Sequence, residues 1–153
     1  MSQLKQQIHA STLATLEGKI AALKKSIADL QQAASEDTKS SAGDKFETSR
    51  EMMKLEIEKN NVQLRQLNSM KQLLAKCTPD QPSEEIRLGA LVKSNEGLYY
   101  FAVPLGKVEA AGESCFVLSL ASPIGKALLG KKVKNGDGIF PFRKLMSIFG
   151  LRF

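Results

Sequence analysis

Several residue types that build catalytic or metal sites are scarce in this sequence. It has 153 residues, with one histidine, His9, and two cysteines, Cys77 and Cys115, which lie far apart and form no Cys-x-x-Cys or Cys/His cluster. This scarcity excludes disulfide scaffolds, zinc fingers and most histidine-based catalysis. We interpret both cysteines as structural, and His9 as a surface residue of a helix.

Aromatic residues and long apolar runs are also few. Aromatic side chains make up 6% of the chain, tryptophan is absent, and the longest apolar stretch, residues 116–129, is interrupted by serines, a proline and a lysine. We therefore expect no membrane span, no signal peptide and a cytoplasmic location. With 42% apolar and 25% charged residues, disorder and collagen are excluded. The length allows one domain or two small ones. Because a small domain buries only a limited part of its surface, an enzyme with a deep pocket is disfavoured.

Acidic residues are scarce toward the C-terminus. Residues 114–153 carry seven lysines and arginines against Asp137 alone, whereas the 113 residues before them carry fifteen charges of each sign. This distribution suggests a partner with an acidic surface or phosphates, with solubility as the alternative. Four phenylalanines at 140, 142, 149 and 153 could stack on bases, but we interpret them as core residues of a half-buried strand.

Heptad patterns predict two long helices. In the first, over residues 2–34, apolar residues repeat at alternating spacings of four and three, at Leu16, Ile20, Leu23, Ile27, Leu30 and Ala34. In the second, Met53, Ile57, Leu64, Leu67 and Leu74 continue a similar seam. Asn60 occupies a position of that seam, where we expect it to set the register. The polar segment 35–44 is short, so the two helices must lie antiparallel.

The pattern changes after the second helix. Pro79 and Pro82 end it and indicate a linker over residues 78–85. Apolar runs at 89–93, 98–103 and 114–120, separated by turn residues, then predict a small sheet. Ser122 and Pro123 are typical of an N-cap and a first helical residue, so a short helix is expected over 124–129, before Gly130. A turn at 134–138 and a last apolar run at 139–149 follow.

The sequence therefore predicts an α+β protein. Residues 1–77 would form an antiparallel coiled-coil hairpin with its tip near 35–47. Residues 86–153 would form a small β-sheet domain with one short helix.

Two motifs in the sequence have the spacing of possible sites. Residues 125–131 fit Gly-x-x-x-x-Gly-Lys, but Lys132 replaces the Ser or Thr that a P-loop requires, so nucleotide binding is not expected. Asp44 and Glu47 lie three residues apart at the start of the second helix and would face the same side. Such a pair can be a capping box, or it can present carboxylates to a metal that another protein holds.

The chain resembles the Gre-type transcript-cleavage factors of bacterial RNA polymerase. The resemblance covers most of the chain in order: the helical hairpin, the Gly-Asp-x-x-Glu tip at residues 43–47, the linker with prolines, the small β-rich domain and the run SPIGKALLGKKV from Ser122 to Val133. It implies an FKBP-like C-terminal domain. The chain would then be an accessory factor that activates the nuclease of the polymerase, and not itself an enzyme.

The resemblance also implies roles for individual residues. The C-terminal domain would dock on the polymerase through Ser122, Pro123 and Ile124, and the hairpin would enter the secondary channel. There Asp44 and Glu47 would help to hold a second Mg²⁺, shared with the polymerase, for cleavage of backtracked nascent RNA. The free protein would hold no cofactor, and because a hairpin satisfies its own seam we expect a monomer.

Two alternatives remain open. The family usually continues its tip with Asn-Ala-Glu-Tyr, whereas residues 48–51 here are Thr-Ser-Arg-Glu. This difference favours a secondary-channel regulator or inhibitor that does not promote cleavage. The FKBP-like resemblance also suggests a prolyl isomerase, although no aromatic pocket is evident.

Overall fold

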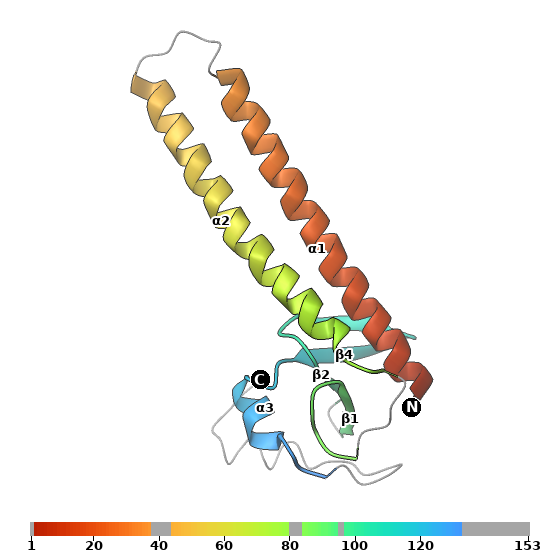
Figure 1. Ribbon diagram of the computed structural model, residues 1–153. Coiled ribbons are helices and arrows are strands. Elements are labelled where there is room, and N and C mark those ends of the chain that lie inside the picture. The colour runs from red at the N-terminus through yellow and green to blue at the C-terminus, as the bar shows by residue number, and fades with distance from the viewer. Residues whose placement is uncertain (1, 38–43, 80–83, 95–96, 133–153) are drawn as a thin grey trace. The chain divides into compact units, whose positions relative to one another are not determined.

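The computed structural model describes residues 2–37, 44–79, 84–94 and 97–132 (Figure 1). The protein is α+β, with two long helices followed by four strands and a short helix. In chain order these are α1 (Ser2–Asp37), α2 (Asp44–Ala75), β1 (Ala90–Ser94), β2 (Gly97–Phe101), β3 (Gly106–Ala110), β4 (Glu113–Leu118) and α3 (Pro123–Leu128). None of the helices in the described ranges is long and apolar enough to cross a membrane. The turn predicted at 134–138, the apolar run at 139–149 and the four C-terminal phenylalanines lie outside these ranges.

The chain divides into two compact units. One consists of Met1–Thr15 together with Met70–Phe153, and we call it the sheet unit. The other, Leu16–Ser69, is the helical unit. The sheet unit therefore includes the first turns of α1 and the end of α2, in addition to the strands.

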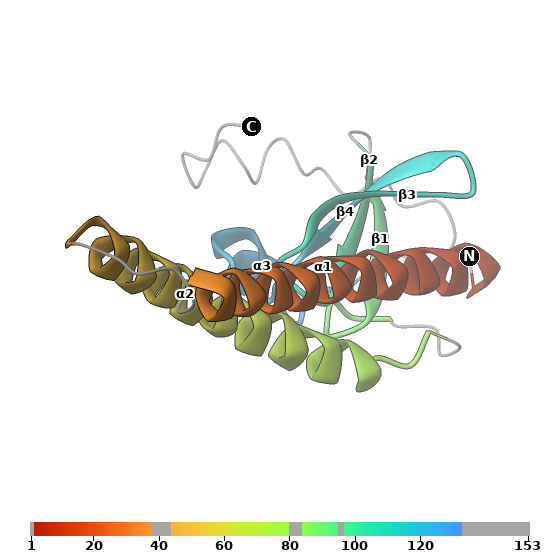
Figure 2. The same ribbon diagram turned by 90° about the horizontal axis from the view of Figure 1, so that it is seen from above.

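In the helical unit, α1 and α2 lie side by side and antiparallel (Figures 1 and 2). Leu16, Ile20 and Ile27 of the predicted first seam are buried. Asn60 of the second seam is also buried, and its Nδ2 donates a hydrogen bond to Ser26 Oγ at 3.2 Å. This bond satisfies the Asn60 side chain at one particular alignment of the two helices, as expected of a polar residue that sets register.

Helix α1 is longer than predicted. The segment 35–37, which we expected to be loop, continues the helix to Asp37. Extending a helix by one residue adds a backbone hydrogen bond, so a polar end does not stop it when no glycine or proline intervenes. In this last turn Gln32 Nε2 also donates to Glu36 Oε1 at 3.1 Å. The rest of the predicted loop, residues 38–43, lies outside the described ranges.

The four strands form one twisted sheet in the order β1-β2-β4-β3 (Figure 2). Strands β1 and β2 pair antiparallel, as do β3 and β4, whereas β2 and β4 pair parallel. Three strands match the predicted apolar runs. Strand β3 was missed because Gly106 and Lys107 suggested a turn and only Val108 is a large apolar residue. It is an edge strand in which buried Val108 and Ala110 alternate with exposed Lys107 and Glu109.

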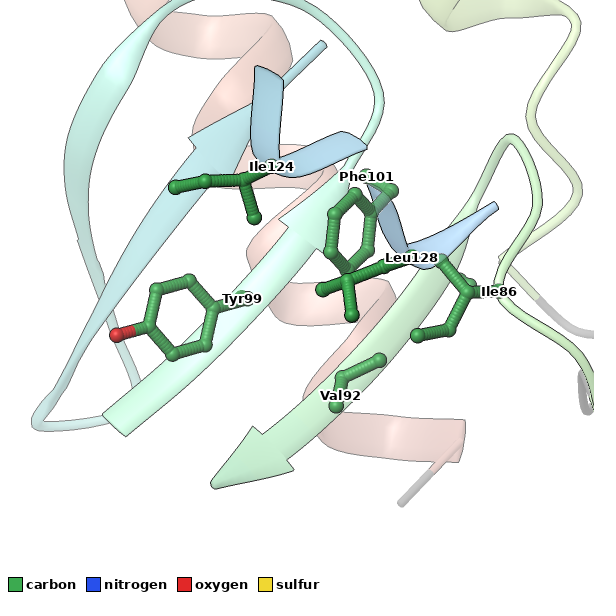
Figure 3. Packing of buried hydrophobic residues seen from close by; sticks show 7 residues of the cluster. Ile86, Val92, Tyr99, Phe101, Ile124 and Leu128 are labelled. Carbon is green, nitrogen blue, oxygen red and sulfur yellow. The ribbon is translucent and has the colours of Figure 1, made fainter. Parts of the chain in front are cut away.

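One face of the sheet is covered by α3 (Figure 3). Ile124 and Leu128 of α3 contribute to a cluster with Tyr99 and Phe101 of β2 and with Val92 of β1. Ile86, from the segment before β1, completes this core, and its backbone N–H donates to Lys131 O at 2.9 Å. The hydrogen bond ties the segment before the sheet to the segment after α3.

The opposite face is buried as well. Tyr100, Cys115 and Val117 of β2 and β4 are fully buried there. The start of α1 reaches this side of the sheet, because His9 Nδ1 lies 2.8 Å from Tyr100 Oη and Ser11 Oγ donates to the backbone oxygen of Glu109 at 2.8 Å. His9 was therefore wrongly predicted to be a surface residue, since it is half-buried and has a hydrogen-bond partner.

Candidate functional site

The first candidate site is the beginning of α2. The helix starts at Asp44, so Asp44 and Glu47 both belong to its first turn, where the positive end of the helix dipole stabilises carboxylates. The Glu47 side chain is exposed. Residues three apart lie on neighbouring positions of a helix, which places the two residues on one side of α2. The arrangement can present two carboxylates from a single helical turn.

These carboxylates suit a hard cation but supply only part of its coordination. Mg²⁺ prefers six oxygen ligands, including water, and is commonly bound by one or two carboxylates with the remaining ligands from elsewhere. Within the described ranges, no group of three or more His, Cys, Asp or Glu residues could hold a metal ion. Two carboxylates from one turn of α2 could supply one or two of the six ligands.

The second candidate site is the turn before α3. Ser122 is the N-cap, as predicted, because its Oγ accepts a hydrogen bond from the Gly125 N–H at 3.0 Å. The same hydroxyl donates to Ser119 O at 2.6 Å, and Ser119 Oγ accepts from the Ala121 N–H at 3.1 Å. Pro123 occupies the first turn of α3. The turn is therefore held rigidly by its own serine side chains.

The three residues expected to dock on a partner differ in exposure. Pro123 is exposed and Ser122 is half-buried. Ile124 is buried, with 7% of its surface exposed, and packs into the core beneath α3. Ile124 thus anchors the helix instead of offering the apolar contact that we expected of it. Of the three residues, only Pro123 is exposed, on a turn that Ser122 and Ile124 hold in place.

The position of Gly125 has no room for a larger residue. A Cβ atom at this position would lie 2.5 Å from Leu120 Cα and 2.7 Å from Leu120 C, both backbone atoms. Residues 125–128 of the motif Gly-x-x-x-x-Gly-Lys at 125–131 therefore belong to the tightly packed helix α3, and the motif does not form a phosphate-binding loop. Its second glycine, Gly130, has a φ of +77° and ends the helix.

A buried polar cluster in the sheet unit was missed by sequence reasoning. It comprises Lys5 and His9 of α1, Cys77 just after α2 and Tyr100 of β2. Lys5 and Cys77 each have 6% of their surface exposed, and Tyr100 is fully buried. Burial, followed by the nearby Arg87 charge, lowers the pKa of Lys5. No local pattern could reveal the cluster, because its members come from distant parts of the chain.

Both cysteines are buried in the sheet unit. Burial raises the pKa of Cys77, although a hydrogen bond with Tyr100 and the charge of Lys5 oppose the effect. Burial raises the pKa of Cys115 to about 12. Both cysteines are free and buried, so both carry a protonated thiol at neutral pH. The interpretation of these cysteines as structural agrees with this environment.

Comparison with known proteins gives no family for this chain. No protein-family model, no curated protein and no solved structure matches it.

Proposed function

We propose that this protein binds RNA polymerase and stimulates cleavage of backtracked RNA by presenting Asp44 and Glu47 in the secondary channel of the polymerase. The observation that carries the proposal is the pair of acids in the first turn of α2, at the end of the helical unit where α1 and α2 are joined. A long, thin helical pair suits entry into a channel, and α2 alone, at 32 residues, is about 48 Å long.

The chemistry required of this protein is limited. In two-metal hydrolysis of a phosphodiester, a second Mg²⁺ stabilises charge and orients the attacking water. Asp44 and Glu47 are the residues that would contribute ligands, while the other ligands would belong to the polymerase and the RNA. The protein would thus be an accessory factor and not an enzyme, working in the cytoplasm as a monomer.

The sheet unit would provide the docking surface, with an FKBP-like fold implied by the resemblance of its sequence. The Ser119–Ser122 hydrogen bond and the packed Gly125 support this role, because a preorganised turn loses little conformational entropy on binding. The exposed Lys126, Lys131 and Lys132 follow the turn and would favour an acidic surface on the polymerase.

The test is release of short 3′ RNA from purified, backtracked elongation complexes. The wild-type protein should stimulate release, and the Asp44→Asn, Glu47→Gln double variant should lose at least tenfold of the stimulation while still binding polymerase. The matched control is Glu51→Gln, the same chemical change one turn further along α2, where the carboxylate is exposed and pairs with Lys54 at 3.0 Å. This variant should retain full stimulation.

A second function is favoured by the sequence after the tip acids. Residues 48–51, Thr-Ser-Arg-Glu, replace the Asn-Ala-Glu-Tyr that is usual in the family. A channel binder with this tip could slow or regulate synthesis without cleavage. In that case the wild-type protein would bind polymerase and change the rate of nucleotide addition, but it would release no short RNA. Failure of the wild type to bind polymerase at all would refute both functions.

A further inference from the structure

The outer face of α2 carries an apolar stripe that the helical unit does not use. Among the described residues, four large apolar side chains are exposed, and three of them lie on α2. Met52 is 66% exposed, Leu55 71% and Val62 40%. We call these three residues the outer stripe. The fourth exposed residue, Leu129, lies at the end of α3.

The outer stripe is distinct from the seam between the helices. The seam residues Met53, Ile57, Asn60 and Leu64 are half-buried or buried. Leu55 and Val62 are seven residues apart, or about two turns, and Met52 precedes Leu55 by three, so the three residues share a face. Along the sequence they alternate with the seam positions. Because their side chains are exposed, they lie on a side of α2 that does not face α1. The stripe cannot therefore be explained by pairing of α1 with α2.

The outer stripe lies on the same side of α2 as the first tip acid. Leu55 follows Asp44 by 11 residues and Val62 follows it by 18, which is close to three and five whole helical turns, at about 3.6 residues a turn. A surface that approaches α2 from the side of Asp44 would therefore continue onto the stripe. This continuity links the stripe to the candidate site and not to an unrelated region.

The charges next to the stripe are already paired. Lys54 Nζ lies 3.0 Å from Glu51 Oε1, and Lys59 Nζ lies 3.8 Å from Glu56 Oε2. These pairs give the border of the stripe little net charge. The complementary surface is therefore apolar with a polar rim, as in the centre of many interfaces, and not strongly acidic or basic.

The size of the stripe excludes a second copy of this chain as a sufficient partner. From the transfer free energy of a large aliphatic side chain, about 1.5–3 kcal/mol at about 25 cal/mol per Å², one such residue buries on the order of 100 Å². Three partly exposed residues offer roughly 200 Å². Stable protein interfaces bury about 1,200–2,000 Å² in total, so a symmetric contact between two stripes is several times too small. The stripe is large enough as one part of an interface whose other contacts lie elsewhere on the chain.

We propose that the outer stripe packs against an apolar patch on the inner wall of the polymerase channel and so strengthens binding of α2 in the channel. This inference rests on the proposed function. It adds a specific contact that contributes to affinity but takes no part in the chemistry of Asp44 and Glu47.

The experiment compares the wild type with the Met52→Gln, Leu55→Gln double variant. Both positions are exposed and glutamine favours helix, so the variant should fold, which circular dichroism will verify. Asn68→Ala is the control, at an exposed position of α2 on a different side of the helix from the stripe. Fluorescence anisotropy measures the dissociation constant for core polymerase. RNA release is measured at saturating protein, and sedimentation velocity gives the oligomeric state.

We expect binding of the double variant to weaken at least tenfold, or about 1.4 kcal/mol, and binding of the control to change less than twofold. RNA release at saturation should be unchanged, because both tip acids remain. Equal binding of the double variant and the wild type would overturn the stripe proposal alone. A wild-type dimer that the double substitution converts to monomer would also overturn it, since a second copy would then cover the stripe. No binding by the wild type would overturn the proposed function itself, and the stripe proposal with it.

Discussion

The hydrogen bond between His9 and Tyr100 should stabilise the sheet unit measurably. His9 Nδ1 and Tyr100 Oη are 2.8 Å apart, and the tyrosine is fully buried. The two residues are 91 positions apart in the sequence, so the bond joins the start of α1 to the middle of the sheet. Their rings also meet edge to face, with centroids 6.2 Å apart.

The expected loss of unfolding free energy follows from the burial of these side chains. Tyr100→Phe removes a hydroxyl and leaves half-buried His9 without this bond, which should cost about 1–2 kcal/mol of unfolding free energy. His9→Leu leaves the hydroxyl of Tyr100 in the interior without its imidazole partner, at a cost of about 1–3 kcal/mol. In the double variant the hydroxyl and the imidazole are both absent. Its cost should therefore be smaller than the sum of the single costs by about 1 kcal/mol.

Urea denaturation followed by tyrosine fluorescence and by circular dichroism measures these values. The chain has no tryptophan, and both tyrosines lie in β2, so the fluorescence reports on the sheet unit. Ser11→Ala serves as the control, because it removes an exposed hydrogen bond of the same length from the same helix and should cost under about 0.5 kcal/mol. Additive effects of His9→Leu and Tyr100→Phe, within about 0.3 kcal/mol, would show that the bond contributes nothing.

Three further predictions concern stability. Gly18→Ala should raise the unfolding free energy by about 1 kcal/mol, because a Cβ at this helical position meets no atom within 4 Å; an unchanged urea midpoint would contradict this. Gly125→Ala should lower the unfolding free energy by at least about 1–3 kcal/mol, because its Cβ would meet the Leu120 backbone; thermal unfolding that matches the wild type would disprove the close packing of α3. Between about pH 9 and pH 12 stability should fall, because burial raises the pKa of Cys115 to about 12 in the folded protein while the unfolded thiol loses its proton near its ordinary value of 9.0. The fall in urea midpoint over this range should be smaller in Cys115→Ala, and equal slopes in the two proteins would exclude this thiol as a cause.

The helical unit was largely predictable because its information is local. The heptad spacing indicated the buried residues Leu16, Ile20 and Ile27, and Asn60 stood out as a polar residue within a seam. In the first turns of α1, which belong to the sheet unit, the sequence has an interruption in its apolar spacing between Ile8 and Leu13. Thr12 occupies this interruption and is fully buried. Its burial is possible because its Oγ1 donates a hydrogen bond to the Ile8 carbonyl at 2.7 Å, which a pattern of hydrophobic residues does not reveal.

The candidate site was predictable only where it depends on neighbours in sequence. The Ser122 cap and the acid pair Asp44 and Glu47 follow from short spacings, and the structure contains the cap as expected. The inward direction of Ile124 depends on how α3 lies against β2, which no local pattern contains. The contact of His9 with Tyr100 depends on the packing of α1 against the sheet, and it was missed for the same reason.

The discontinuous sheet unit has a consequence for folding during synthesis. The helical unit is continuous in sequence, from residue 16 to residue 69, so it can form as soon as that segment leaves the ribosome. The sheet unit must bring residues 1–15 together with residues made much later, including Tyr100, and closing so long a loop is slow. The first turns of α1 therefore remain without their partner strands while most of the chain is made. During that time the side that is buried in the folded protein, including Ile8, stays uncovered. A nascent chain stopped before β2 should expose this apolar surface to chaperones, and one extended past β4 should conceal it.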